Sequence, residues 1–186
     1  MSRISKKTAT FLILSLSIGF IFGIRFCSSA IKSSVTDHSF SKVKGREDAP
    51  IQIVEFIDFQ CSACAKGIKH LKKIIKDHPD KIHLELKYYP LSVHRHGLLS
   101  AHYAECASRQ GKFWVFQDYL IDKQKYWEKL NDAKPTFELF AEWSQLDLKE
   151  LKNCLEDKSV EEFISRNKAE GKILGVKSTP TYFIND

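Results

Sequence analysis

The stretch that decides the fold is VEFIDFQCSAC, residues 54–64, where a largely apolar run leads directly into two cysteines three positions apart. The run extends from Ile51 to Phe59 and is rich in β-branched and aromatic residues. Such a composition is typical of a central strand that is covered on both faces. Its charged exceptions are Glu55 and Asp58.

A helical period begins at the first cysteine. Cysteine or apolar residues recur at steps of three and four, at positions 61, 64, 68, 71 and 75. This spacing predicts one buried helix face. His78 and Pro79 end the helix, and residues 81–89 then alternate between polar and apolar, as expected of a second strand. Because one helix joins the two strands, we expect them to lie parallel.

The segment from about 96 to 171 has a helical pattern almost throughout. Two helix starts are indicated by pairs with capping-box spacing, Asp147 with Glu150 and Ser159 with Glu162. After Pro180, residues 181–184 predict a short final strand. The sequence therefore predicts an α/β fold with an inserted α-helical subdomain.

Residues 1–30 differ from the rest of the chain. Basic residues are followed by an uncharged stretch from Thr8 to Ile24, and small residues precede position 31. This pattern predicts a signal peptide or an N-terminal membrane anchor. Residues 31–47 are polar and read as a linker, with a short leading strand near 40–43 as the alternative. The folded domain is expected at 48–186.

The net charge of +6 does not point to nucleic acid. Four of the 29 basic residues lie within the first 30 positions, and all 23 acidic residues follow them. The remaining chain therefore carries a formal charge of only +2. This value gives no electrostatic support for nucleic-acid binding.

The strongest chemical signal is the cysteine pair at the start of a helix. Residues three apart in a helix have Cα atoms about 5 Å apart, within the range that a disulfide requires. The unpaired amides of the helix N-terminus stabilise a thiolate, so Cys61 is the expected nucleophile. Cys64 shares the buried stripe and is the expected resolving thiol. This chemistry needs no cofactor.

Two other readings of the pair are a stapling disulfide and half of a zinc site. A structural zinc needs two further ligands, usually another closely spaced pair, and the chain has no second C-x-x-C or H-x-x-x-H. His94 and His96 could serve as ligands, but we expect them to be solvated loop residues. No metal site is therefore predicted.

Glu55 lies in the middle of the apolar strand, six residues before Cys61. An ionised carboxylate is costly there unless it is paired or protonated. We therefore expect Glu55 to handle a proton near Cys64. Lys87 on the neighbouring strand is a candidate partner, and a solvent-facing position for Lys87 is the alternative.

Four segments in this order resemble the DsbA family of disulfide oxidoreductases: VEFIDFQCSAC (54–64), KYYPL (87–91), CASRQGKFW (106–114) and STPTYFI (178–184). The likeness runs from about Gly45 to Asp186. It implies a thioredoxin-like fold with an inserted α-helical subdomain, the architecture that the periodicity also predicts.

The resemblance also implies roles for individual residues. Cys61 and Cys64 match the redox pair, and Glu55 matches the buried acid. Thr179 and Pro180 match the residue and the cis-proline that face the dithiol, where the backbone of Thr179 can pair with an extended substrate. Some relatives carry a second disulfide in the helical subdomain, which implies a Cys106–Cys154 bridge. Two buried free thiols are the alternative.

The sequence departs from the family pattern in two places. Ser62 and Ala63 stand between the cysteines, without the histidine of the most oxidising members, so a milder oxidant is expected. Family members also continue past this point with another strand and a closing helix, whereas this sequence stops at Asp186. Either the sequence is truncated at this point, or a sheet edge is left uncovered.

We expect an extracytoplasmic enzyme, periplasmic or membrane-anchored, that introduces disulfides into reduced exported proteins. The resemblance implies reoxidation by a DsbB-type membrane quinone reductase. The same motif also serves disulfide isomerases and reductases. Readings from other classes are a periplasmic metal-binding module and a structural protein that keeps the fold without the activity.

Overall fold

The computed structural model describes residues 42–185. The predicted signal peptide or anchor at 1–30 and most of the predicted linker lie outside the described residues. Within residues 42–185, no helix is both long enough and apolar enough to cross a membrane.

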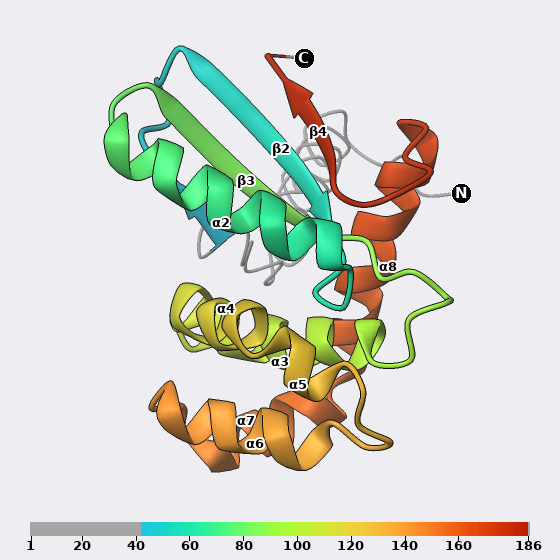
Figure 1. Ribbon diagram of the computed structural model, residues 1–186. Helices are drawn as coiled ribbons and strands as arrows, with labels where there is room; N and C mark the ends of the chain where they lie inside the picture. Colours follow the sequence, from blue (N-terminus) through green and yellow to red (C-terminus); the bar gives the residue numbers. More distant parts are fainter. Residues whose placement is uncertain (1–41, 186) are drawn as a thin grey trace, which may run out of the picture. The chain divides into compact units, whose positions relative to one another are not determined.

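The centre of the domain is a mixed sheet with the strand order β1-β3-β2-β4 (Figure 1). The strands are β1 (Val43–Lys44), β2 (Ile51–Ile57), β3 (Ile82–Tyr88) and β4 (Thr181–Ile184). β2 runs parallel to β3 and antiparallel to β4, and β1 pairs antiparallel with β3. The predicted central position of β2 and its parallel pairing are confirmed.

Both faces of β2 are covered, which explains its nearly continuous apolar sequence. On one face, Ile53 packs with Leu71 of α2 (Ser62–Asp77). On the other face, Phe56 packs with Tyr89 and Val176. Figure 1 shows α2 lying along one face of the sheet, as the helical period from Cys61 predicted.

The helices that separate β3 from β4 run from Gly97 to Ile173. They are α3 (Gly97–Arg109), α4 (Phe113–Asp122), α5 (Gln124–Trp127), α6 (Lys134–Trp143), α7 (Leu148–Glu156) and α8 (Lys158–Ile173). In Figure 1, α3 to α7 gather beyond one end of the sheet, and α8 runs back toward β4. The thioredoxin-like arrangement with a helical insertion is therefore confirmed.

Side-chain caps set the starts of the last two helices. Asp147 caps α7 by accepting hydrogen bonds from the amides of Lys149 and Glu150, as its spacing predicted. The start predicted at Ser159 is wrong. Asp157 caps α8 instead, because its carboxylate accepts both the amide and the hydroxyl hydrogen of Ser159.

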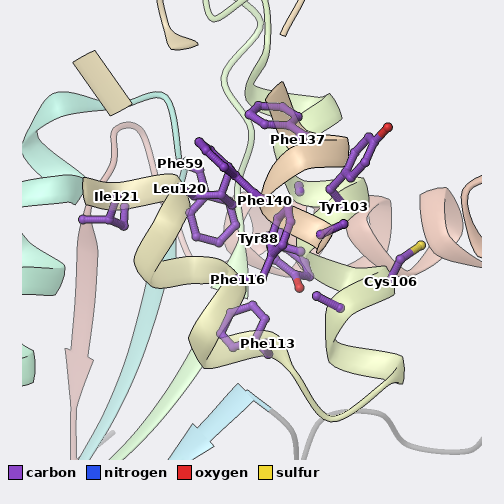
Figure 2. Close-up of a cluster of buried hydrophobic side chains, with 14 of the residues drawn as sticks. Phe59, Tyr88, Tyr103, Cys106, Phe113, Phe116, Leu120, Ile121, Phe137 and Phe140 are labelled. Atoms are coloured by element: carbon purple, nitrogen blue, oxygen red, sulfur yellow. The ribbon is translucent and has the colours of Figure 1, made fainter. Parts of the chain in front are cut away.

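An aromatic cluster joins the sheet to the helical insertion. Figure 2 shows Phe59, two residues after β2, and Tyr88, the last residue of β3, among side chains of α3, α4 and α6. The cluster is continuous with the core that buries Cys64. Because close-packed interiors resist deformation, the insertion holds the carboxyl ends of β2 and β3 in place.

A disulfide between Cys106 and Cys154 links α3 to α7, with a Cα separation of 5.8 Å. Beside it, the buried Lys42 Nζ lies 2.9 Å from the Glu105 carboxylate on α3. The bridge and the ion pair both attach to α3, so this helix ties the insertion to the start of the described chain.

Removal of the bridge in Cys106→Ala/Cys154→Ala should lower the free energy of unfolding. The bridge spans 48 positions, and the chain-entropy estimate for a loop of this size is about 4 kcal/mol as an upper value. Denaturant titration followed by circular dichroism measures the change. A loss below about 1 kcal/mol would show that the bridge contributes little to stability.

Candidate active site

Cys61 occupies the N-cap of α2. Its backbone is extended (φ −74°, ψ 119°), and its carbonyl accepts the first helical hydrogen bond, from the amide of Ala65, at 3.1 Å. No side chain caps this helix end, and the first turn contains no acidic residue. The orphan amides and the helix dipole are therefore free to stabilise a thiolate at this position.

The Cys61 thiol meets the turn before β4. Its Sγ donates a hydrogen bond to the Thr179 carbonyl oxygen at 3.3 Å, although the two residues are 118 positions apart. The peptide bond between Thr179 and Pro180 is cis. The Cys61 side chain is only partly buried, so a partner molecule can reach the sulfur.

Cys64 lies one helical turn deeper and is fully buried. Both cysteines are free thiols in the structure. Burial raises the pKa of Cys64 well above its usual range, whereas the Asp58 backbone and the Thr179 side chain act in the opposite direction. Cys64 is therefore a protonated thiol at neutral pH. It is also buried, whereas Cys61 is partly exposed.

Glu55 is fully buried, and neither of its carboxylate oxygens has a well-formed hydrogen bond to a described residue. Desolvation raises the pKa of Glu55 to about 7, and the Tyr182 phenol, on the paired strand β4, works against this rise. The carboxylate lines a cavity of about 10 Å³ with Gln117, which has room for one water at most.

Lys87 is not the partner of Glu55. In the register of the two strands Lys87 pairs with Phe56, so that its side chain points to the opposite face of the sheet from Glu55. Its Nζ instead forms an ion pair with Glu170 of α8. Tyr182, whose pKa is itself raised by burial and by the nearby Glu55 and Cys64, is the group that lies close to both.

Asp58 organises the turn between β2 and α2. Its buried carboxylate accepts hydrogen bonds from the amides of Gln60 (2.8 Å) and Leu91 (2.7 Å) and lies 2.8 Å from His94 Nδ1. Its carbonyl oxygen accepts a hydrogen bond from the amide of Cys61 at 3.0 Å. One residue therefore fixes both the entry to α2 and the loop after β3.

The expectation that His94 and His96 are solvated is wrong. His96 is 4% exposed, its amide donates to Gln60 Oε1, and its Nε2 lies 2.8 Å from the Leu130 carbonyl. His94 is only partly exposed and is held by Asp58. Within residues 42–185, no group of three or more His, Cys, Asp and Glu side chains could hold a metal ion.

The helical insertion also contacts the dithiol turn. Gln124 of α5 donates from Nε2 to the carbonyl oxygens of Phe59 (2.6 Å) and Cys61 (3.0 Å). Sequence reasoning missed the contributions of Gln124, Tyr182 and Asp58. Only Asp58 gave a signal, as a polar residue in the apolar run, because the other two act through contacts between distant segments.

The structure thus gathers most of the residues singled out from the sequence. Cys61, Cys64 and Thr179 are in direct contact, and Glu55 approaches Cys64 through Tyr182. Cys106 and Cys154 lie apart from this group, between α3 and α7.

A sequence model of the thioredoxin family matches residues 38–186. The chain belongs to the thioredoxin family. Within this family it is 27% identical over 158 residues to the probable disulfide bond formation protein D of Bacillus cereus, covering 80% of this chain and 71% of that protein. The likeness to DsbA-type proteins, predicted from the four segments, is confirmed.

A solved structure carries the same likeness. The crystal structure of Wolbachia pipientis alpha-DsbA1 superposes with a TM-score of 0.67 at 25% identity, over 78% of this chain and 75% of that one. The chain is also 29% identical over 145 residues to the Na(+)/H(+) antiporter NhaA 3 of Salinispora tropica. That match covers 77% of this chain but only 21% of the antiporter, so the chain spans about a fifth of that protein.

The buried Glu55 should make stability depend on pH. Its pKa rises from 4.5 to about 7 on folding, so the unfolded chain releases the proton first and folding stability falls as pH rises through this window. Relative to Glu55→Gln, the wild type should lose about 3 kcal/mol between mildly acid and mildly alkaline pH. Chemical denaturation across this range measures it.

Glu47→Gln is the control, because Glu47 is exposed in the same part of the chain. If the free energy of unfolding changes with pH in the same way for the wild type and for Glu55→Gln, the pKa of Glu55 is not raised by folding.

The two thiols should differ in reactivity. In the reduced native protein at neutral pH, iodoacetamide should alkylate Cys61 alone, because Cys64 is fully buried and its pKa is raised. Peptide mass analysis after a short pulse locates the label, and a pulse in denaturant should label both residues. Equal labelling of the two thiols in the native protein would contradict this geometry.

Proposed function

We propose that the protein is a DsbA-type thiol-disulfide oxidoreductase that introduces disulfides into exported proteins. The observation that carries the proposal is the pairing of an accessible N-cap cysteine, Cys61, with a fully buried partner, Cys64, against the Thr179–Pro180 turn. A stapling disulfide would not need one accessible sulfur at an uncapped helix N-terminus.

The exchange starts from the Cys61–Cys64 disulfide. A substrate thiolate attacks Cys61 Sγ, the bond between the two protein sulfurs breaks, and Cys64 leaves. A second substrate thiolate then attacks the substrate sulfur of the mixed disulfide, and Cys61 leaves as a thiolate at the helix N-terminus. The substrate loses two electrons and two protons, and the protein gains them as its dithiol.

The leaving Cys64 needs a proton, because its buried environment strongly disfavours the thiolate. Glu55 is suited to supply it, since its pKa of about 7 leaves both the protonated and the ionised form populated near neutral pH. Tyr182, which lies close to both groups, is a suitable bridge between them. We therefore assign Glu55 to proton transfer and Cys61 and Cys64 to sulfur exchange.

Thr179 and Pro180 are proposed to bind the substrate chain. The Thr179 carbonyl already accepts from the Cys61 thiol, so backbone beside the turn lies next to the reacting sulfur. An extended substrate segment that hydrogen-bonds to the Thr179 backbone would bring its own cysteine to Cys61. This mode of binding recognises the main chain of the substrate and not its side chains, which suits an enzyme with many protein substrates.

Export and reoxidation complete the proposal. The pattern of residues 1–30 supports a periplasmic or other extracytoplasmic location, reached with a cleaved signal or a retained anchor. In such a compartment disulfides persist, and a DsbB-type membrane quinone reductase would return the dithiol to the disulfide.

A disulfide isomerase or reductase is the second candidate. The residues between the cysteines, Ser62 and Ala63, include no histidine that could help to hold the Cys61 thiolate. A less stabilised thiolate makes the disulfide form less oxidising, which favours a reducing role.

The test is oxidative refolding of reduced ribonuclease with the oxidised protein as the only oxidant. The wild type should restore ribonuclease activity stoichiometrically, and Cys61→Ala should give only the rate seen without protein. Cys64→Ala cannot form the Cys61–Cys64 disulfide, so it should also give only the rate seen without protein. A wild type that fails here but reactivates scrambled ribonuclease would be an isomerase, and no reaction in either assay would reject a redox function.

A further inference from the structure

The Asp58 carboxylate is a buried charged group that the exchange steps above do not use. Its side chain is fully buried, at 0% exposure. Two of its hydrogen-bond partners are backbone amides, those of Gln60 and Leu91, and the third is the imidazole of His94. The imidazole is the one of these three partners that can supply a compensating charge.

The backbone of Asp58 lies in contact with both cysteines. The Asp58 backbone accepts from the amide of Cys61 and also contacts the Cys64 thiol. The first residue of α3, Gly97, is in such close contact that a Cβ there would lie 2.8 Å from an Asp58 carboxylate oxygen. The charge therefore sits where β2, α2 and α3 meet and has no room to move away.

We propose that the Asp58–His94 pair sets the equilibrium between the disulfide and dithiol forms of Cys61 and Cys64. The negative charge of Asp58 opposes a thiolate at Cys61 and so disfavours the dithiol form, whereas a proton on His94 cancels this charge. Asp58 and His94 are positioning residues in this account, because neither exchanges sulfur. The inference concerns the same dithiol as the proposed function and rests on it.

His94 is well placed for this role because it opens to the same surface as the dithiol. It lines a pocket of about 330 Å³ with Gln60 and Ser62, and Ser62 directly follows Cys61. The other charged residues of this pocket, Glu128 and Lys129, are of opposite sign and offset each other. On this side of the dithiol, the Asp58–His94 pair therefore sets the balance of charge, whereas Glu55 lies in the sheet on the side of Tyr182.

The experiment measures the equilibrium of the purified protein with glutathione, followed by alkylation and mass analysis. One protein disulfide and two glutathione thiols give one protein dithiol and one glutathione disulfide, a transfer of two electrons and two protons. Asp58→Asn removes the negative charge and should shift this equilibrium about tenfold toward the dithiol, which is about 30 mV for two electrons.

His94→Asn should act in the opposite direction. Its amide can still donate to Asp58 but cannot carry a positive charge. Without the imidazole to offset it, the Asp58 charge would then stand uncancelled, and the equilibrium should shift several-fold toward the disulfide. Opposite shifts are a signature of charge, because loss of structure alone would have no reason to give both signs.

Two matched substitutions on α2 serve as controls. Asp77→Asn makes the same chemical change at the far end of the helix, and His70→Asn makes it on an exposed position, so neither should move the equilibrium. Shifts of the same sign in Asp58→Asn and His94→Asn, or no shift in either, would overturn the proposal. If Asp58→Asn does not fold by circular dichroism, the sign of the His94→Asn shift decides.

The ribonuclease assay separates this inference from the proposed function. The glutathione equilibrium needs only a reversible dithiol, so opposite shifts in a protein that does not oxidise ribonuclease would support the charge pair and reject the oxidase. If the protein oxidises ribonuclease normally but neither substitution shifts the glutathione equilibrium, the oxidase is supported and the role of the charge pair is rejected.

Discussion

The hydrogen bond from Cys61 Sγ to the Thr179 carbonyl is the contact on which the site depends. It requires that β2 and β4 be neighbours, since Cys61 follows β2 and Thr179 precedes β4. The antiparallel register places Phe56 of β2 opposite Thr181 of β4, which brings the cis-proline turn to the N-terminus of α2. The chemistry of the dithiol therefore follows from one strand pairing between segments that are far apart in the sequence.

The helical insertion supports this contact from the other side. Gln124 holds the carbonyls of Phe59 and Cys61, and the aromatic cluster fixes the ends of β2 and β3 against α3, α4 and α6. Asp58 adds a tie from the same turn to the loop after β3. The insertion thus stabilises the turn that contains Cys61. Substitutions within the insertion can therefore affect disulfide exchange although the substituted residues do not contact the substrate.

Many of the strands and helices could be predicted from local sequence patterns. The strand before Cys61, the helix after it and the final strand at 181–184 each show periodicity or composition that short-range physics determines. The start of α8 was misplaced because Asp157 and Ser159 both have capping chemistry, and only the backbone shows which one is used. The pairing of Lys87 with Glu55, one of the two expectations for Lys87, was wrong because the strand register places the two side chains on opposite faces of the sheet.

Contacts between residues that are far apart in the sequence could not be predicted from local patterns. Tyr182 and Gln124 are ordinary residues in the sequence, and they matter because β4 pairs with β2 and because α5 packs beside the dithiol turn. His94 and His96 looked like solvated loop residues, yet the loop folds back on Asp58 and Gln60. The tertiary contacts of these four residues therefore left no local signal in the sequence.

The most direct test of this account is the structure of Cys64→Ala joined through Cys61 to a short cysteine peptide. The peptide is expected to lie extended beside the Thr179–Pro180 turn, with main-chain hydrogen bonds to Thr179. A peptide held by the sulfur bond alone, or lying on another face of α2, would contradict it.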